Sequence, residues 1–342
     1  MERAIDAGYG WTKFSTGNAY FSDEKIGVDV KAFQSLPRLV PRETFARLAG
    51  VETHGTTVGV KVKNQSYLVS EEFCYSTDTL RPRNHNYCST HQYEVCMAAA
   101  LKAMNLDFLD HLVVGAPCGS YEATKAFLKE KFGRGIIIDE KSVEIRNLHV
   151  VAQPVGGLVW HYYAKGLQNQ LGQQTRVLVD AGQGTLDWVT AQGLKSNLER
   201  SGTVQLGVGH FVDRIVSEIK GVKAPEDVWF SDQVERMLLR DQPLIFGNHA
   251  HRLEDYQALI QQVATEGVKH IESSIGDVRM YQSVVLMGGG APLYKDAVNK
   301  AFNSTKVEVV DAARFANVRG FQLLAQRQAS LANPTGPRKG PR

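Results

Sequence analysis

Two similar stretches lie half a chain apart. The first is Arg3-Ala-Ile-Asp6-Ala-Gly8-Tyr9-Gly10-Trp11-Thr12-Lys13-Phe14 and the second is Leu178-Val-Asp180-Ala-Gly182-Gln183-Gly184-Thr185-Leu-Asp187-Trp188. Each reads as an apolar strand that ends in Asp-Ala-Gly-x-Gly and turns into a second strand, as in a tight hairpin. The two aspartates, Asp6 and Asp180, are 174 positions apart in a chain of 342 residues. This spacing predicts two related α/β lobes, each with one glycine-rich hairpin.

The residue types of these hairpins are typical of phosphate binding. The glycines have no Cβ, so a polyphosphate can approach the backbone N–H groups. An aspartate at the end of a strand is a hard oxygen ligand for Mg²⁺ or for its water shell. Lys13 can supply positive charge and Thr185 a hydroxyl. At matching positions the copies carry Lys13 and Asp187, so we expect one hairpin mainly to bind phosphate and the other to manage metal and water.

Other nucleotide-binding and hydrolytic motifs are missing from the sequence. There is no G-x-x-x-x-G-K-[ST], which excludes a P-loop protein. The glycine pairs lack the third glycine of a dinucleotide-binding fingerprint, and no G-x-S-x-G or H-E-x-x-H occurs. A third glycine element does follow an apolar strand, in Ser283-Val-Val-Leu-Met287-Gly288-Gly289-Gly290-Ala291-Pro292-Leu293. Three glycines before a helix let a flat ring lie against the backbone.

Charge and hydropathy exclude several classes of protein. Lys and Arg number 39 and Asp and Glu 36, a net charge of +3, and Arg338, Lys339 and Arg342 stand in the last five residues. The rest of the chain is therefore near neutral, and no recognisable DNA-reading motif is present. No stretch approaches the roughly 20 apolar residues of a membrane span. Four cysteines without a C-x-x-C pair indicate reduced thiols and a cytoplasmic protein.

A short His/Cys cluster allows two interpretations. His85, Cys88, His91 and Cys96 could hold a metal ion. Alternatively, Ser89-x-x-Gln92 is a capping box that opens a helix over Tyr93–Met104, and the cluster then has ordinary structural places. We favour the structural interpretation.

The three glycine elements, in this order, resemble the phosphate-1, phosphate-2 and adenosine segments of the actin/Hsp70/sugar-kinase superfamily. Val113-Val-Gly-Ala-Pro117, followed by a helix over Tyr121–Lys131, resembles a further segment of that superfamily. Phe315-Ala-Asn317-Val-Arg-Gly320-Phe321 and Leu206-Gly-Val-Gly209 are similar to the ParM/StbA branch of plasmid-segregating actin-like proteins. The resemblance implies an α/β, actin-like (ribonuclease H-like), duplicated two-lobe fold with a nucleotide in the interlobe cleft.

The resemblance also assigns roles to residues. Asp6 and Asp180 would hold Mg²⁺, through water, on opposite sides of the phosphates of ATP. Gln153, in Ala152-Gln153-Pro154, would orient the attacking water; a neutral amide is no efficient base, so hydrolysis should be slow. Tyr9 stands where relatives often have Ser or Thr. The implied nucleotide contacts are Gly8, Tyr9, Gly10, Trp11, Thr12, Lys13, Gly182, Gln183, Gly184, Thr185, Gly207, Gly288, Gly289 and Gly290.

The expected organisation crosses between the lobes more than once. Lobe I takes residues 1–150, with a β-rich outer insertion at about 35–90 in which Thr57–Lys63 and Tyr67–Ser70 alternate like strands. Lobe II takes residues 151–316, with a helical insertion at about 211–275. Residues 317–329 form a helix that returns to lobe I, and residues 330–342 form a disordered basic tail.

The expected function is that of an actin-like ATPase whose nucleotide-dependent filaments segregate plasmid DNA. Its partners would be further copies of itself and a DNA-binding adaptor at a centromere-like site, with no direct sequence-specific DNA binding and no membrane contact. A small-molecule kinase of the same superfamily is an alternative, although its acceptor site is not recognisable. A chaperone-like nucleotide switch is another, but no peptide-binding domain is visible. A membrane-attached filament is disfavoured, because neither end carries an amphipathic anchor.

Overall fold

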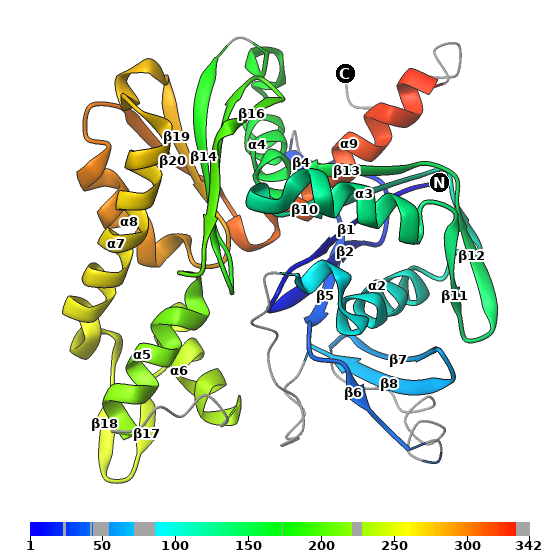
Figure 1. Ribbon diagram of the computed structural model, residues 1–342, viewed down its shortest axis with the longest axis horizontal. Helices are drawn as coiled ribbons and strands as arrows, with labels where there is room; N and C mark the ends of the chain where they lie inside the picture. The colour runs from blue at the N-terminus through cyan, green and yellow to red at the C-terminus, as the bar shows by residue number, and fades with distance from the viewer. Residues whose placement is uncertain are drawn as a thin grey trace. The chain divides into compact units, whose positions relative to one another are not determined.

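Two five-stranded sheets carry the fold (Figure 1). They belong to a computed structural model that describes residues 1–22, 25–41, 43, 55–71, 86–172, 174–220 and 228–332. One sheet lies in a unit formed by residues 1–168 with 315–342, and the other in a unit formed by residues 169–314. We call these the first and the second unit.

The first sheet has the strand order β13-β10-β1-β2-β5. Its strands in chain order are β1 (Glu2–Ala7), β2 (Trp11–Ser15), β5 (Val30–Gln34), β10 (His111–Ala116) and β13 (Leu148–Ala152). β1 runs antiparallel to β2, which runs antiparallel to β5. On its other side β1 is parallel to β10, and β10 is parallel to β13.

The second sheet repeats this arrangement strand by strand, in the order β20-β19-β14-β15-β16. Its strands are β14 (Thr175–Ala181), β15 (Leu186–Gln192), β16 (Lys195–Val204), β19 (Ser283–Met287) and β20 (Lys306–Val309). β14 is antiparallel to β15 and parallel to β19, as β1 is to β2 and β10. The duplicated two-lobe α/β fold predicted from the two aspartate–glycine hairpins is confirmed.

Four helices pack on the first sheet, on both of its faces. They are α2 (His91–Met104), α3 (Tyr121–Phe132), α4 (Gln153–Ala164) and α9 (Ala316–Ala332). Val114 of β10 belongs to the apolar core that contains Val95 and Leu101 of α2. A Cβ on the adjacent Gly115 would instead meet Phe321 of α9. Since neighbouring residues of a strand point to opposite faces, α2 and α9 cover opposite sides of the sheet.

Helices pack on the second sheet as well, and a small hairpin of the same unit packs on one helix, α6 (Val228–Arg240). The helices are α5 (Val208–Lys220), α6, α7 (Gln257–Ile275) and α8 (Ala291–Ala301), and the hairpin strands are β17 (Leu244–Phe246) and β18 (His249–His251). Val177 and Val179 of β14 lie in one apolar core with Phe211 of α5 and Tyr294 of α8. Residues 211–275, for which the sequence predicts a helical insertion, contain most of α5, all of α6 and α7, and this hairpin.

Among the described residues, three smaller sheets belong to the first unit. β6 (Arg38–Leu39), β7 (Thr57–Val62) and β8 (Gln65–Ser70) form one, in the order β6-β8-β7 and inside the β-rich insertion expected at 35–90. β9 (Phe108–Leu109), β11 (Gly135–Ile138) and β12 (Lys141–Ile145) form the second. β3 (Tyr20–Ser22) pairs with β4 (Lys25–Gly27) in the third.

The close crossing of α4 and α9 explains why glycines are found there. A Cβ on Gly320 of α9 would lie 1.8 Å from the carbonyl oxygen of Gly156 in α4. Nearby, the Gly157 N–H donates to Asn317 Oδ1 at 3.0 Å. Because α4 packs on α9 and on the first sheet, the first unit continues to residue 168, whereas the sequence placed the boundary at 150.

Two predictions at helix ends need correction. Thr90, not Ser89, caps α2: its side chain accepts from Tyr93 N–H at 3.2 Å, and the helix starts at His91. The Ser89 hydroxyl instead donates to the carbonyl oxygen of Asn86 at 2.7 Å. At the other end of the chain, Ser330–Ala332 continue α9, three residues that the sequence assigned to the tail. Residues 333–342 lie outside the described residues.

Candidate functional site

Two predicted site residues converge on the carboxylate of a third in the first unit. Asp6, at the end of β1, is 2% exposed, and Lys13 lies opposite it on β2. Lys13 Nζ lies 2.9 Å from Asp6 Oδ2. Gln153, the first residue of α4, donates from Nε2 to Asp6 Oδ1 at 3.0 Å. Residues separated by almost 150 positions therefore meet at the hairpin that the sequence singled out.

This arrangement fixes the Gln153 amide. An amide that donates through Nε2 presents its Oε1 on the other side as an acceptor. Gln153 can thus accept a hydrogen bond from a water molecule while its own position is held by Asp6. Lys13 neutralises the buried carboxylate and keeps a cation beside the glycine hairpin.

The second hairpin follows β14 and is supported mainly by backbone. Gly182 N–H donates to the carbonyl oxygen of Thr185 at 2.9 Å, which closes the turn. The start of α5 donates three further bonds to this turn, from Gly207 to Gly184 (3.3 Å), Val208 to Gly182 (3.0 Å) and Gly209 to Gln183 (2.8 Å). A Cβ on Gly207 would lie 2.5 Å from the backbone of Gly184, so this close approach requires glycine.

Two carboxylates face each other across the second hairpin. Asp180 of β14 pairs in register with Asp187 of β15, at the position where the first hairpin pairs Asp6 with Lys13. Like charges directly opposite are unfavourable in a sheet. Asp187 is satisfied by hydroxyls, since its oxygens accept from Thr185 Oγ1 and Thr203 Oγ1, both at 2.5 Å. The Thr185 hydroxyl, which we expected to face a phosphate, thus donates to Asp187 in this structure.

The glycine run after β19 lies directly behind Asp180. Gly288 has φ +91°, and a Cβ there would lie 2.3 Å from Asp180 Oδ1 and 2.4 Å from the carbonyl oxygen of Ala181. Gly290 N–H donates to that same carbonyl at 2.8 Å. Gly289, by contrast, has open space around its Cβ position. The second and third glycine elements therefore meet within the second unit.

One residue near the second hairpin could not be identified as a site residue from the sequence. Glu235 of α6 is 9% exposed, and its Oε2 accepts from Gln183 Nε2, at the tip of the hairpin, at 3.0 Å. A glutamate in an amphipathic helix reads as an ordinary surface residue, so only the fold brings it to the glycine turn.

Each hairpin carries a buried aspartate carboxylate, the type of group that binds a magnesium ion through water. Hard oxygen ligands and a retained water shell are what Mg²⁺ prefers. Asp180 is 7% exposed and, unlike Asp6, has another carboxylate rather than a lysine opposite it. Among the described residues no group of three or more His, Cys, Asp or Glu side chains gathers to hold a metal directly.

The His/Cys cluster of the sequence is structural where the structure describes it. His91 Nε2 lies 2.9 Å from the Tyr67 hydroxyl, and its Nδ1 lies 3.3 Å from Glu94 Oε2. Cys96 is fully buried, and burial raises the pKa of its thiol to about 11, so it stays protonated. His85 lies outside the described residues.

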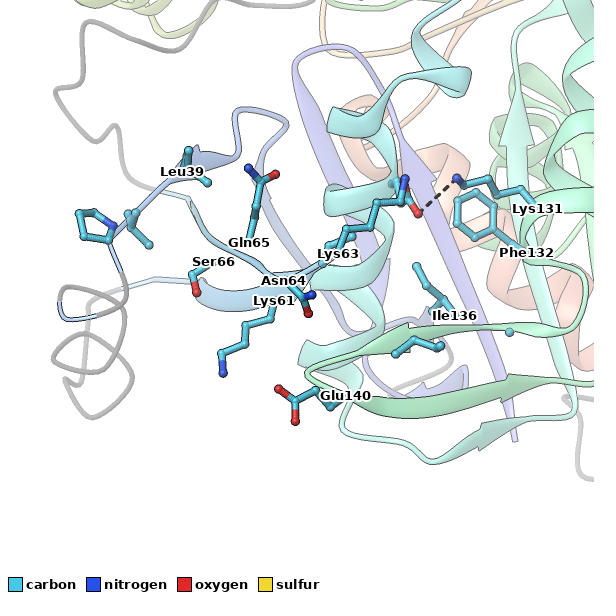
Figure 2. Close-up of a pocket in the computed structure, with 16 residues that line it drawn as sticks. Leu39, Lys61, Lys63, Asn64, Gln65, Ser66, Lys131, Phe132, Ile136 and Glu140 are labelled. Carbon is cyan, nitrogen blue, oxygen red and sulfur yellow. Dashed lines mark hydrogen bonds and ion pairs between the residues drawn. The ribbon is translucent and has the colours of Figure 1, made fainter.

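An open groove of about 1100 Å³ lies elsewhere in the first unit (Figure 2). It is lined by the β7–β8 turn, the end of α3 and β11, and Lys63 and Lys131 both pair with Glu94 there, at 2.8 and 3.2 Å. None of the predicted site residues lines this groove.

In the part of the chain that the structure describes, no helix has the length and apolar composition to cross a membrane.

Two family profiles match the chain. The family profile "Actin like proteins N terminal domain" matches residues 4–156, and "Archaeal actin homologue MreB-like, C-terminal" matches residues 178–300. A search of curated protein sequences gave no match.

Solved structures of similar fold cover nearly the whole chain. Ta0583, an archaeal actin homolog in complex with ADP, is 19% identical, covers 96% of this chain and 100% of its own, and has a TM-score of 0.68. A 15-stranded ParM filament from Clostridium botulinum is 18% identical over 95% and 99%, with a TM-score of 0.69. The actin-like protein Alp7A is 13% identical over 97% and 98%, with a TM-score of 0.66. The fold is therefore actin-like.

Proposed function

We propose that this chain, which belongs to the actin-like proteins, binds ATP with Mg²⁺, hydrolyses it slowly and assembles into filaments that segregate plasmid DNA. The observation that carries the proposal is the convergence of Lys13 and Gln153 on Asp6 at a glycine hairpin. It combines a phosphate-binding turn, a cation and a fixed amide in one place. ADP in the Ta0583 structure supports a purine nucleotide as the ligand.

In this proposal the two hairpins and the glycine run bind one nucleotide. The turns around Tyr9 and Gln183 donate backbone N–H groups to the phosphates, and Lys13 adds positive charge. Gly288–Gly290 pack on the adenosine. The remaining proposed contacts are Gly8, Gly10, Trp11, Thr12, Gly182, Gly184, Thr185 and Gly207.

Asp6, Asp180 and Gln153 carry the proposed chemistry. Mg²⁺, when bound, neutralises charge on the phosphates. Asp6 and Asp180 hold its water shell, and Gln153 orients the attacking water through Oε1. Because a neutral amide takes up no proton, hydrolysis is slow. Slow hydrolysis would delay the change from ATP to ADP after a subunit has joined a filament.

The filament part of the proposal rests on the ParM filament structure, and the DNA part rests on the resemblance of residues 206–209 and 315–321 to plasmid-segregating actin-like proteins. The near-neutral charge of the chain, +3 over 342 residues, fits a protein that reaches DNA through an adaptor rather than by its own basic surface. We therefore expect the purified chain alone not to retard plasmid DNA at near-physiological salt.

Sedimentation and light scattering test assembly directly. At micromolar protein with Mg²⁺, ATP should give pelletable polymer and ADP should give little. A chain that binds and hydrolyses ATP but never assembles would refute the filament and leave the nucleotide site standing. Phosphate release, measured in the same samples, separates these two parts.

A further inference from the structure

Ser35 holds the first glycine hairpin from behind. It follows β5 directly, is completely buried, and belongs to none of the predicted contacts. Its backbone N–H donates to the carbonyl oxygen of Gly10 at 2.9 Å, and its hydroxyl donates to the carbonyl oxygen of Gly8 at 2.7 Å. One residue thus binds the carbonyls on both sides of Tyr9.

The direction of the hydroxyl bond is determined by its partners. The Gly8 carbonyl can only accept, so the single Ser35 hydroxyl proton goes to it. Thr12 Oγ1, 2.8 Å away and equally buried, must then be the donor toward Ser35 Oγ. The orientation of both hydroxyls follows from the hairpin carbonyl.

This bond sets the orientation of the Gly8–Tyr9 peptide. In a trans peptide the C=O and the N–H point in opposite directions. With its carbonyl bonded to Ser35, this peptide points the Tyr9 N–H away from Ser35. The flanking Gly8 and Gly10 would otherwise let the peptide rotate, because glycine has access to many backbone conformations.

Ser35 is itself held by α2. Gln92 Nε2, in the first turn of that helix, donates to the carbonyl oxygen of Ser35 at 2.8 Å. Beside it the Tyr9 ring stacks on Tyr87, with centroids 5.0 Å apart and 27° between the planes. The hydroxyl therefore acts from a rigid support rather than from a free loop.

We propose that Ser35 is a positioning residue that fixes the first hairpin in its phosphate-binding conformation. The role in phosphate binding rests on the proposed nucleotide site, whereas the role in hairpin rigidity does not. Losing one buried hydrogen bond from this support should weaken nucleotide binding about five- to tenfold.

Ser35→Ala tests this, with Ser15→Ala as a matched control. Ser15 is also a completely buried serine in the first sheet, and its hydroxyl also makes two bonds, from Ala4 N–H (2.9 Å) and to Gln322 Oε1 (2.6 Å). Both variants should unfold at a lower temperature. Only Ser35→Ala should bind a fluorescent ADP analogue about five- to tenfold more weakly, and Ser35→Thr, which keeps the hydroxyl, should recover most of the affinity.

Hydrogen exchange without nucleotide provides an independent second readout. Amides of the segment around Tyr9 should exchange about tenfold faster in Ser35→Ala and unchanged in Ser15→Ala. Equal loss of affinity in the two alanine variants, or an unchanged exchange rate in Ser35→Ala, overturns the proposal. If the wild-type chain fails to bind the analogue while the exchange result holds, the nucleotide assignment fails and the positioning of the hairpin stands. Should Ser35→Ala not fold, Ser35→Cys, with its weaker donor, should give the same effects at smaller size.

Discussion

The two glycine hairpins have the same strand pairing but are stabilised in different ways. Each turn is closed by one backbone bond, from Gly8 to Trp11 in the first and from Gly182 to Thr185 in the second. The first is also held by side chains: Lys13 and Gln153 on Asp6, and the Ser35 hydroxyl on Gly8. The second is held by backbone bonds from the start of α5. The first pairs a carboxylate with a lysine, whereas the second pairs two carboxylates. A single cross-strand position is therefore enough to give two hairpins of the same strand pairing a different local charge.

Replacing Asp180 should have the largest effect. Asp180→Ala removes the proposed metal-side carboxylate and should lower phosphate release by about 100-fold or more. Steady-state phosphate release with ATP and Mg²⁺ measures this. Asp296→Ala, on the exposed side of α8, is the control and should behave like wild type. Unchanged phosphate release in Asp180→Ala would show that the metal assignment is wrong.

The glycines behind Asp180 give a matched pair for stability. Gly288→Ala forces a Cβ against Asp180 Oδ1 at a φ of +91°, and should cost about 2–4 kcal/mol of unfolding free energy. Gly289→Ala meets open space and should cost less than about 1 kcal/mol. Urea titration of both variants measures the difference. Equal losses would mean that the backbone behind Asp180 is not as tightly packed as described.

Gln153 tests the side-chain support of the first hairpin. Gln153→Ala should slow phosphate release about tenfold, because the water loses its acceptor, while the affinity for ADP stays within about threefold. Gln153→Glu puts a second carboxylate beside Asp6 and should weaken nucleotide binding as well. A fall in ADP affinity without a change in hydrolysis rate would assign Gln153 to binding alone.

The smallest effect is a dependence of stability on pH, present in both units. Burial, and next the neighbouring His111, lower the pKa of His149 on β13; burial, and next Arg214, lower that of His210 on α5. The unfolded chain therefore takes up protons first as the pH falls below about 6.5. The contribution of these two histidines to the unfolding free energy is fully present above that pH. It decreases as the pH falls from there to the pKa of each histidine in the folded state.

Denaturation at several pH values separates the two histidines. His149→Gln should reduce the pH dependence of the unfolding free energy of the first unit, and His210→Gln that of the second unit. A dependence of the same size in both variants and in wild type would place its origin at other groups.

The sequence predicted what depends on local pattern and missed what depends on tertiary packing. Apolar runs that end in Asp-Ala-Gly-x-Gly were sufficient for the paired hairpins and the duplicated sheets. Asp187 accepts a hydrogen bond from Thr203 because β15 pairs with β16, and the register of that pairing shifts at a bulge. The local sequence does not reveal this partner. Ser35 is a lone hydroxyl more than twenty positions from the turn that it holds. The cap of α2 was misplaced by one residue, since Ser89 and Thr90 are adjacent and both are residue types that cap helices.

The crossing of α4 and α9 has a consequence for the order in which the protein is made. A ribosome delivers the first unit first, but that unit lacks α9 until residues 316–332 have emerged. Until then the Gly156 face of α4 is uncovered, and Ser15 has no Gln322 to bond. The second unit, encoded without interruption, can close earlier. The helix that completes the unit containing Asp6 and Gln153 is therefore synthesised after the second unit, and a nascent chain acquires that half of the proposed nucleotide site last.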